Sequence, residues 1–310
     1  MQSHTVEVSA AAALVGLLTA VPAAATPFTF STGNPDGLMA TATRPQSTGK
    51  IEIESADDFV LTSPTSITSA TFTGLLTGGA TTANIGEVVV EIYRVFPALS
   101  DVGRTSGPPI FSTPQVPTRV NSPSDVELED RNTSPAPGNL TFTTKVLNGS
   151  FSALNSVQPG GIHPIPNQTT GGDGSVTGEE VEFDVNFTTP FSLPPDHYFF
   201  VPQVEITTAS GEFLWLSAPK PIVLPGTPFP PGFTDLQEWT RDINLEPDWL
   251  RVGTDIVGGT TPPTFNAAFS LTGVVPEPAS LSLLGAALAG MGLLGWRRGR
   301  RNQSSVRTLM

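Results

Sequence analysis

Carboxylates outnumber every other kind of ionisable side chain in this chain of 310 residues. The sequence contains 28 Asp and Glu residues, against 15 Lys and Arg and only three His. Two carboxylates at a suitable separation are enough for glycoside hydrolysis, and the candidates are Asp57, Asp58, Glu205 and Glu212. Because alternation along predicted strands turns most of these acids toward solvent, the pattern favours a non-catalytic protein over a glycan-active enzyme.

Two groups of acidic residues have the composition of a calcium-binding loop. Ca²⁺ prefers clustered carboxylate and carbonyl oxygens on flexible segments. The first group is Asp125, Glu127, Glu129 and Asp130, and the second is Asp173, Glu179 and Glu180. Neither group has the spacing of an EF-hand, so a structural Ca²⁺ ion stays an alternative to two solvated acidic loops. No other cofactor is predicted.

Histidine, serine and cysteine chemistry is poorly represented. The three histidines are His4, His163 and His197, and none stands at a metal-ligand spacing such as His-Glu-x-x-His. No Gly-x-Ser-x-Gly turn that would hold a serine nucleophile is present. The chain has no cysteine, which excludes thiol nucleophiles, thiolate zinc sites and disulfides. We expect His163 and His197 to be ordinary loop residues.

Aromatic residues could instead form a platform for sugar rings. Large aromatic faces suit stacking, and the candidates are Tyr198, Trp215, Phe233, Trp239 and Trp249. Trp215 lies in a Phe-Leu-Trp-Leu run that is typical of a buried strand. Trp239 and Trp249 flank loop-like stretches, so they are the better candidates for a carbohydrate-binding module, which is the alternative to a surface protein without a ligand site.

Charge divides the chain into an acidic middle and a basic tail. Residues 26–275 hold 10 basic and 26 acidic residues, a net charge of −16, whereas the remaining five arginines follow Trp296. A segment this acidic repels nucleic acid and anionic lipid. We therefore expect no nucleic-acid partner.

Short strands joined by turns are the elements expected in the acidic middle. Proline (31) and glycine (30) are frequent, and β-branched and aromatic residues recur between turn signals. Residues 197–206 and 212–217 are expected to form a hairpin, and 235–246 the one short helix. The predicted strands are 51–61, 66–76, 87–96, 141–147, 180–187, 197–206, 212–217 and 264–272.

Two of these strands show how the domain should be layered. In 51–61 apolar and acidic residues alternate, which predicts a strand with one face in water. In 180–187 the alternation is strict, so we expect its apolar set to face a core; this set is Val181, Phe183, Val185 and Phe187. The pattern predicts an all-β fold, a single jelly-roll-like antiparallel sandwich.

An apolar run over residues 10–25 precedes the predicted sandwich. It ends in three alanines, a small-x-small pattern of the kind that signal peptidase cleaves, and Thr26 follows. No Lys or Arg precedes the run, which departs from the usual signal peptide. We predict a signal peptide with a helical apolar core at 1–25, and the alternative is a buried helix of the mature domain.

The C-terminal segment combines three features in a fixed order. Pro276-Glu277-Pro278 comes first, 18 uncharged residues follow over 279–296, and the segment closes with Arg297, Arg298, Arg300 and Arg301. At about 1.5 Å per residue, a helix of this length spans about 27 Å, close to the hydrocarbon thickness of a bilayer. The arginines favour the cytoplasmic side. The predicted membrane helix therefore leaves 26–274 outside and 302–310 as a cytoplasmic tail.

These three features resemble the PEP-CTERM sorting signal of Gram-negative bacteria, over residues 275–301. The resemblance implies an exported protein whose tail is recognised by an exosortase, a membrane-embedded transpeptidase-like protease, with Pro276, Glu277 and Pro278 as recognition residues. It implies an inner-membrane-anchored precursor that loses the hydrophobic part. The destination would be the cell surface or the extracellular matrix of bacteria that make exopolysaccharide. A plain membrane anchor is the alternative.

A second resemblance covers the predicted sandwich. The runs Ala-Asp-Asp-Phe at 56–59 and Ala-Phe-Ser-Leu-Thr-Gly at 268–273 are similar to the first and last strands of many PEP-CTERM ectodomains. Those ectodomains are taken to be β-sandwiches. Together the two resemblances imply a non-catalytic surface or matrix protein, with an exosortase, the membrane and exopolysaccharide as its partners.

Overall fold

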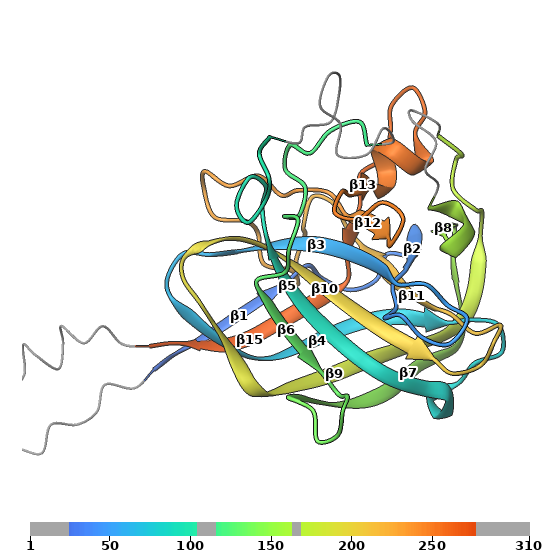
Figure 1. Ribbon diagram of the computed structural model, residues 1–310, viewed down its shortest axis with the longest axis horizontal. Coiled ribbons are helices and arrows are strands. Elements are labelled where there is room, and N and C mark those ends of the chain that lie inside the picture. Colours follow the sequence, from blue (N-terminus) through green and yellow to red (C-terminus); the bar gives the residue numbers. More distant parts are fainter. Residues whose placement is uncertain (1–24, 104–115, 163–168, 277–310) are drawn as a thin grey trace, which may run out of the picture. The chain divides into compact units, whose positions relative to one another are not determined.

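The computed structural model describes residues 25–103, 116–162 and 169–276, and strands make up most of its regular structure (Figure 1). Within these ranges no helix is both long and apolar enough to cross a bilayer. The predicted signal peptide, membrane helix, arginine cluster and His163 lie outside the described residues. In chain order the elements are β1 (Thr26–Ser31), β2 (Met39–Ala42), β3 (Ile53–Leu61), β4 (Thr65–Leu76), a 3₁₀ turn (Thr82–Asn84), β5 (Ile85–Arg94), β6 (Glu129–Asn132), β7 (Leu140–Ala153), β8 (Asn155–Val157), a 3₁₀ turn (Pro159–Gly161), β9 (Val176–Leu193), β10 (Asp196–Ile206), β11 (Phe213–Ala218), β12 (Trp239–Asp242), β13 (Leu250–Arg251), a π-helix (Val252–Val257), β14 (Asn266–Ala267) and β15 (Phe269–Val275).

Two sheets form the layers of the fold. The larger has nine strands, six of them in the order β1-β15-β4-β11-β2-β8, with β9 and then β7 joined to β4, and β14 joined to β11. The smaller has six strands in the order β13-β12-β3-β10-β5-β6. The predicted all-β sandwich is confirmed at the level of class and layers. The parallel pairing of β2 with β8 departs from the purely antiparallel arrangement, and the jelly-roll-like connectivity stays a prediction.

Aromatic rings from both sheets fill the space between them. Phe72 of β4 stacks on Phe183 of β9, with ring centroids 4.8 Å apart, and Phe200 of β10 stacks on Phe269 of β15 at 5.0 Å. Burying one such side chain stabilises a fold by about 1.5–3 kcal/mol, which matters in a domain without disulfides. The strand β9 directs its apolar set into this core as predicted; the set is Val181, Phe183, Val185 and Phe187.

Strand β3 is covered on both faces, contrary to the half-buried strand that the sequence predicted. All nine of its residues are buried. Phe59 and Leu61, on one face of the strand, belong to the aromatic core. Ala56, on the opposite face, belongs to a second cluster around Trp239 and Trp249. Ser124 lies against this cluster, because its carbonyl oxygen accepts a hydrogen bond of 3.3 Å from Trp249 Nε1.

Two other predictions are wrong. Strands β10 and β11 do not form a hairpin, because β10 pairs with β3 and β5 whereas β11 pairs with β2 and β4 in the other sheet. Residues 207–212 therefore carry the chain from one layer to the other. The predicted helix over 235–246 is strand β12, which pairs with β3 through Trp239↔Ala56. Its near-helical apolar spacing arises from a short strand followed by a turn.

Gly74 shows how closely the larger sheet is packed. It lies in β4 opposite Val181 of β9 and Trp215 of β11. A Cβ atom there would overlap the Phe213 ring and lie 2.6 Å from the backbone oxygen of Leu214. The Gly74→Ala variant should therefore lose about 1–3 kcal/mol of unfolding free energy, measured by urea unfolding of the full-length protein in detergent.

A matched substitution separates crowding from the general effect of replacing glycine. Gly149 in β7 has open space where a Cβ would be, so Gly149→Ala should change stability little. Equal unfolding curves for the two variants would contradict the close packing at Gly74.

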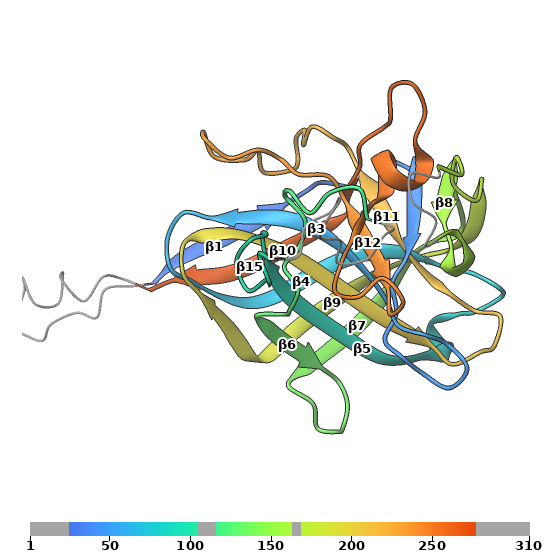
Figure 2. The same ribbon diagram turned by 45° about the horizontal axis from the view of Figure 1, so that its top comes forward.

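The chain enters and leaves the sandwich along neighbouring strands. β1 and β15 are adjacent in the larger sheet, and both reach the same side of the domain, on the left in Figures 1 and 2. β15 keeps its pairing with β4 as far as Val274↔Ser66. The sheet therefore ends at Val275, one residue before the exposed Pro276.

Candidate functional site

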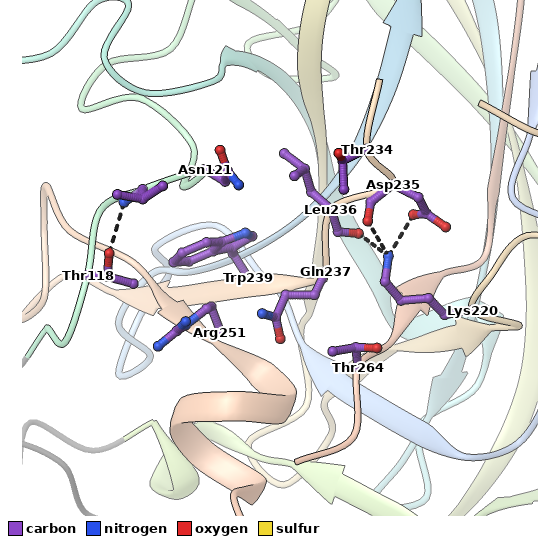
Figure 3. A pocket seen from close by; sticks show the side chains of 11 residues that line it. Thr118, Asn121, Lys220, Thr234, Asp235, Leu236, Gln237, Trp239, Arg251 and Thr264 are labelled. Atoms are coloured by element: carbon purple, nitrogen blue, oxygen red, sulfur yellow. Dashed lines mark hydrogen bonds and ion pairs between the residues drawn. The ribbon is translucent and has the colours of Figure 1, made fainter. Parts of the chain in front are cut away.

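A pocket of about 330 Å³ lies beside strand β12. Its lining comes from segments that are far apart in the sequence: 118–121, 234–237, the paired strands β12 and β13, and single residues before β12 and β14 (Figure 3). Its volume is at the lower end of the range for small-molecule sites. Among the pockets found within the described residues, this one contains a tryptophan that the sequence singled out, Trp239.

Lys220 fixes the segment that forms one side of the pocket. Its ammonium group donates to Asp235 Oδ1 at 2.6 Å, to the Asp235 carbonyl oxygen at 3.0 Å and to Asn266 Oδ1 at 2.8 Å. It also donates to the carbonyl oxygen of Leu236. Hydrogen bonds from a charged donor are the stronger kind. The charge of Lys220 is therefore neutralised inside the protein, and segment 234–237 is held in place.

Two buried acids, Asp57 and Asp58, anchor the same region from β3. Asp58 Oδ2 accepts a hydrogen bond of 3.2 Å from the Leu236 amide and lies 2.5 Å from His197 Nε2. Asp57 Oδ2 accepts a hydrogen bond of 2.8 Å from the Ala267 amide. Burial raises the pKa of Asp58 to about 6 and that of Asp57 well above its usual range.

The positions of these acids correct two predictions. Asp57 and Asp58 are 0 % and 1 % exposed, so they do not face solvent. They do not line the pocket either. The second correction concerns His197, which is not an ordinary loop residue, because it lies in β10 and pairs with the buried Asp58. The arrangement orients backbone and imidazole groups rather than presenting a carboxylate to a substrate.

Arg251 and Trp239 form another wall of the pocket. The guanidinium carbon of Arg251 lies 5.9 Å from the centre of the Trp239 ring. Asp255 in the π-helix accepts from Arg251 Nε at 2.9 Å and from Nη2 at 2.6 Å. This bidentate pair neutralises the second cation of the pocket. The Trp239 side chain is almost fully buried, and its Nε1 has no hydrogen-bond partner among the described residues.

Trp249 lies under a buried ion pair. The guanidinium carbon of Arg241 is 4.3 Å from the centre of the Trp249 ring, and Arg241 pairs with Glu54 through both carboxylate oxygens. The Tyr93 hydroxyl donates to Glu54 Oε1 at 2.6 Å. Trp239 and Trp249 are each 1 % exposed, so the open ring faces that the sequence predicted for sugar stacking are not present at either residue.

The acids predicted as calcium ligands are not brought together. Asp125 forms an ion pair with Arg119, Glu127 is exposed, and Asp173 Oδ2 accepts a hydrogen bond of 2.7 Å from the Gln158 amide. Within 25–103, 116–162 and 169–276, no three His, Asp or Glu side chains are grouped to hold a metal ion. The structure therefore adds no support for the calcium hypothesis.

The remaining predicted residues are also dispersed. Glu212 pairs with Arg44 at 2.5 Å and with Lys50 at 3.5 Å, whereas Glu205 accepts a hydrogen bond of 3.1 Å from the Glu87 amide. Of the other candidates for a sugar platform, Tyr198 and Trp215 are buried, whereas Phe233 is exposed. Burial of Trp215 in a strand confirms its prediction as a core residue.

Sequence reasoning missed most of the side chains that shape the pocket. Lys220, Gln237 and Arg251 carry no motif, and they meet only because three separate segments fold together. One signal was available, since the acidic middle has only 10 basic residues. An isolated lysine or arginine between apolar residues in such a segment is a candidate for a buried ion pair.

The predicted sorting segment starts where the folded sandwich stops. Pro276 is exposed and directly follows β15. Glu277, Pro278, the apolar run 279–296 and the arginine cluster lie outside the described residues. The last strand of the sandwich thus ends at residue 275, directly before this segment.

Comparison with protein families found one match. Residues 274–301 fit the model described as the PEP-CTERM protein-sorting motif, and the match begins inside β15. Comparisons with curated proteins and with solved structures found no significant match. The motif implies an exported protein with a membrane-anchored precursor that an exosortase recognises. The chain therefore carries a PEP-CTERM protein-sorting motif at its C-terminal end.

Proposed function

We propose that this protein is a non-catalytic component of the cell surface or extracellular matrix that associates with exopolysaccharide. In this proposal, residues 1–25 direct export and are removed, and 279–296 hold the precursor in the inner membrane. Arg297, Arg298, Arg300 and Arg301 keep the end of the chain cytoplasmic, and an exosortase recognises Pro276, Glu277 and Pro278. The observation that carries the proposal is the motif match over residues 274–301.

The environment of the acids supports a non-catalytic role. Asp57 and Asp58 are buried and accept backbone hydrogen bonds, and Glu212 is neutralised by Arg44. A glycosidase needs two carboxyl groups facing one substrate. The acid that lines the pocket beside β12 is Asp235, and its carboxylate forms an ion pair with Lys220.

Replacing Pro276-Glu277-Pro278 with three alanines should block processing in the native host. The unmodified protein should lose its hydrophobic tail and appear outside the inner membrane. The variant should accumulate as full-length precursor in the membrane fraction, because the exosortase no longer recognises it. Mass spectrometry of both termini, with immunoblots of cell fractions, measures this.

The chain offers a matched control, since Pro135-Ala136-Pro137 is a Pro-x-Pro sequence within the described residues, and all three of its residues are exposed. Replacing it with alanines should leave processing and location unchanged. If the Pro276-Glu277-Pro278 variant is processed and located like the unmodified protein, the tail is a plain anchor and the proposal is wrong. Association with exopolysaccharide is measured separately, by co-sedimentation of the mature protein with polymer purified from the host.

A further inference from the structure

The pocket beside β12 presents hydrogen-bonding groups that the protein itself does not use. Gln237 Oε1 accepts a hydrogen bond of 3.0 Å from Thr254, which leaves the amide nitrogen of Gln237 available. The side chain of Asn121 makes no hydrogen bond within the described part of the chain. In Figure 3, Trp239 lies between Asn121 and Arg251, with Gln237 beside it.

The backbone at Asn121 supports a role for its amide. Its φ is +64°, in the left-handed region that few residues other than glycine adopt. Asparagine tolerates this region better than most residues, so the conformation is compatible with this side chain. Asn121 lies in a turn and lines the pocket.

The charges of the pocket are balanced within the protein. Lys220 is paired with Asp235, and Arg251 is paired with Asp255. The surrounding acidic domain, with its net charge of −16, disfavours anions further. An anionic ligand would therefore find no unpaired cation and an unfavourable field. Beside these paired charges, what the pocket offers is neutral: the side-chain amides of Gln237 and Asn121 and threonine hydroxyls.

We propose that this pocket binds one neutral sugar unit, a polyhydroxylated ring without a carboxylate, sulfate or phosphate. Such a ring needs both donors and acceptors, which amide and hydroxyl side chains supply together. The volume of about 330 Å³ corresponds to about eleven liquid water molecules, enough for a single ring with its hydroxyl groups. Contact is through Gln237 and Asn121, while the buried Trp239 shapes the wall.

One wall of the pocket, segment 234–237, is held in place by the protein itself, which favours binding. Segment 234–237 is held by Lys220 on one side and by Asp58 on the other. A preformed site loses less conformational entropy when the ligand binds. The inference rests on the proposed function, because it identifies a neutral sugar as the part of the polymer that the protein contacts.

Titration of the full-length protein with simple sugars tests the assignment. The protein is kept in a detergent without sugar groups, and the probes are glucose, galactose, mannose, N-acetylglucosamine and, as the charged comparison, glucuronate. Tryptophan fluorescence and saturation-transfer NMR report binding. We expect at least one neutral sugar to bind with a dissociation constant of about 1 mM or tighter, and more tightly than glucuronate.

Two pocket variants and one control locate the site. Gln237→Ala and Asn121→Gly, the second of which keeps the left-handed backbone, should each weaken binding at least about tenfold. Asn186→Ala, at an exposed position of β9, should not, and thermal unfolding shows whether each variant is folded. Absence of binding to every neutral sugar, unchanged binding in both folded pocket variants, or preference for glucuronate would overturn the inference.

The outcome is independent of the sorting proposal. If the pocket binds no sugar but the tail is processed, only the pocket assignment is wrong. If the pocket binds a sugar but alanines at 276–278 leave processing intact, the sorting proposal is wrong.

Discussion

Replacing Arg241 with methionine should lower the free energy of unfolding by about 3–5 kcal/mol. Arg241 is 3 % exposed, and its partner Glu54 is 5 % exposed. The guanidinium also donates to the Pro247 carbonyl oxygen at 3.1 Å and to the Tyr93 hydroxyl at 3.1 Å. Without it, the Glu54 carboxylate stays buried without a counter-charge. Urea unfolding of the full-length protein in detergent, followed by tryptophan fluorescence, measures the loss.

A double substitution tests the cause. Arg241→Met combined with Glu54→Gln should recover a large part of the stability, because no uncompensated charge remains in the interior. The exposed pair Arg94–Asp196, with N and O 3.6 Å apart and side chains 30 % and 43 % exposed, is the control. Arg94→Met should cost less than about 1 kcal/mol. If Arg241→Met costs no more than Arg94→Met, the ion pair does not stabilise the fold.

The Glu238→Gln variant should be more stable than the unmodified protein above pH 8, by a few kcal/mol, and similarly stable near pH 5. Glu238 is 1 % exposed, and neither carboxylate oxygen has a hydrogen-bond partner among the described residues. Burial raises the pKa of Glu238 from 4.5 to about 8, although the nearby Thr41 hydroxyl favours the ionised form. The folded protein therefore contains the neutral carboxylic acid at neutral pH.

The sign follows from proton binding. Between pH 4.5 and about 8 the folded state keeps a proton on Glu238 that the unfolded chain has lost. The free energy of unfolding therefore falls as pH rises through this window, by about 1.4 kcal/mol per pH unit for one group. Glutamine cannot ionise, so in the variant the free energy of unfolding should fall less steeply with pH. Burial also raises the pKa of Asp57, so part of the decrease in stability with rising pH should remain in the Glu238→Gln variant.

Urea unfolding at several pH values from 5 to 9 measures the slope. The control is Glu127→Gln, which makes the same Glu-to-Gln substitution at an exposed position of the chain. The interpretation of Glu238 as a buried neutral acid would be wrong if its variant showed the same slope as the unmodified protein.

Strands that alternate strictly could be predicted from the sequence. Residues 180–187 have one apolar face, and β9 buries that face. Strands β10 and β11 are buried on both faces, so their sequences lack an alternation that would say which strand lies next to them. This is why two separate strands were expected to form one hairpin. The apolar spacing of 235–246 was ambiguous for a similar reason, because a short strand and a turn share it with a helix.

The two candidate sites differ in the same way. The sorting motif is a continuous stretch of sequence, so its three parts could be recognised before any fold was known. The pocket depends on contacts such as that of Lys220 with Asn266, which are 46 residues apart. Trp239 was singled out because a tryptophan beside a loop suggests an exposed ring. Residues 118–121 line the pocket together with Trp239, and Ser124 accepts a hydrogen bond from Trp249. No local sequence pattern indicates that this distant segment lies beside the two tryptophans.

If the tail is cleaved as proposed, the direct junction of β15 with Pro276 makes the order of folding and cleavage important. The last strand pairs with β4 as far as Val274, and the motif begins at residue 274. A protease that needs a few extended residues ahead of the motif must act before β15 joins the sheet or wait for its end to separate. If the tail is cleaved as proposed, folding of β15 and cleavage compete in time, and the rate at which the end of β15 separates from β4 limits how fast a folded precursor can be released.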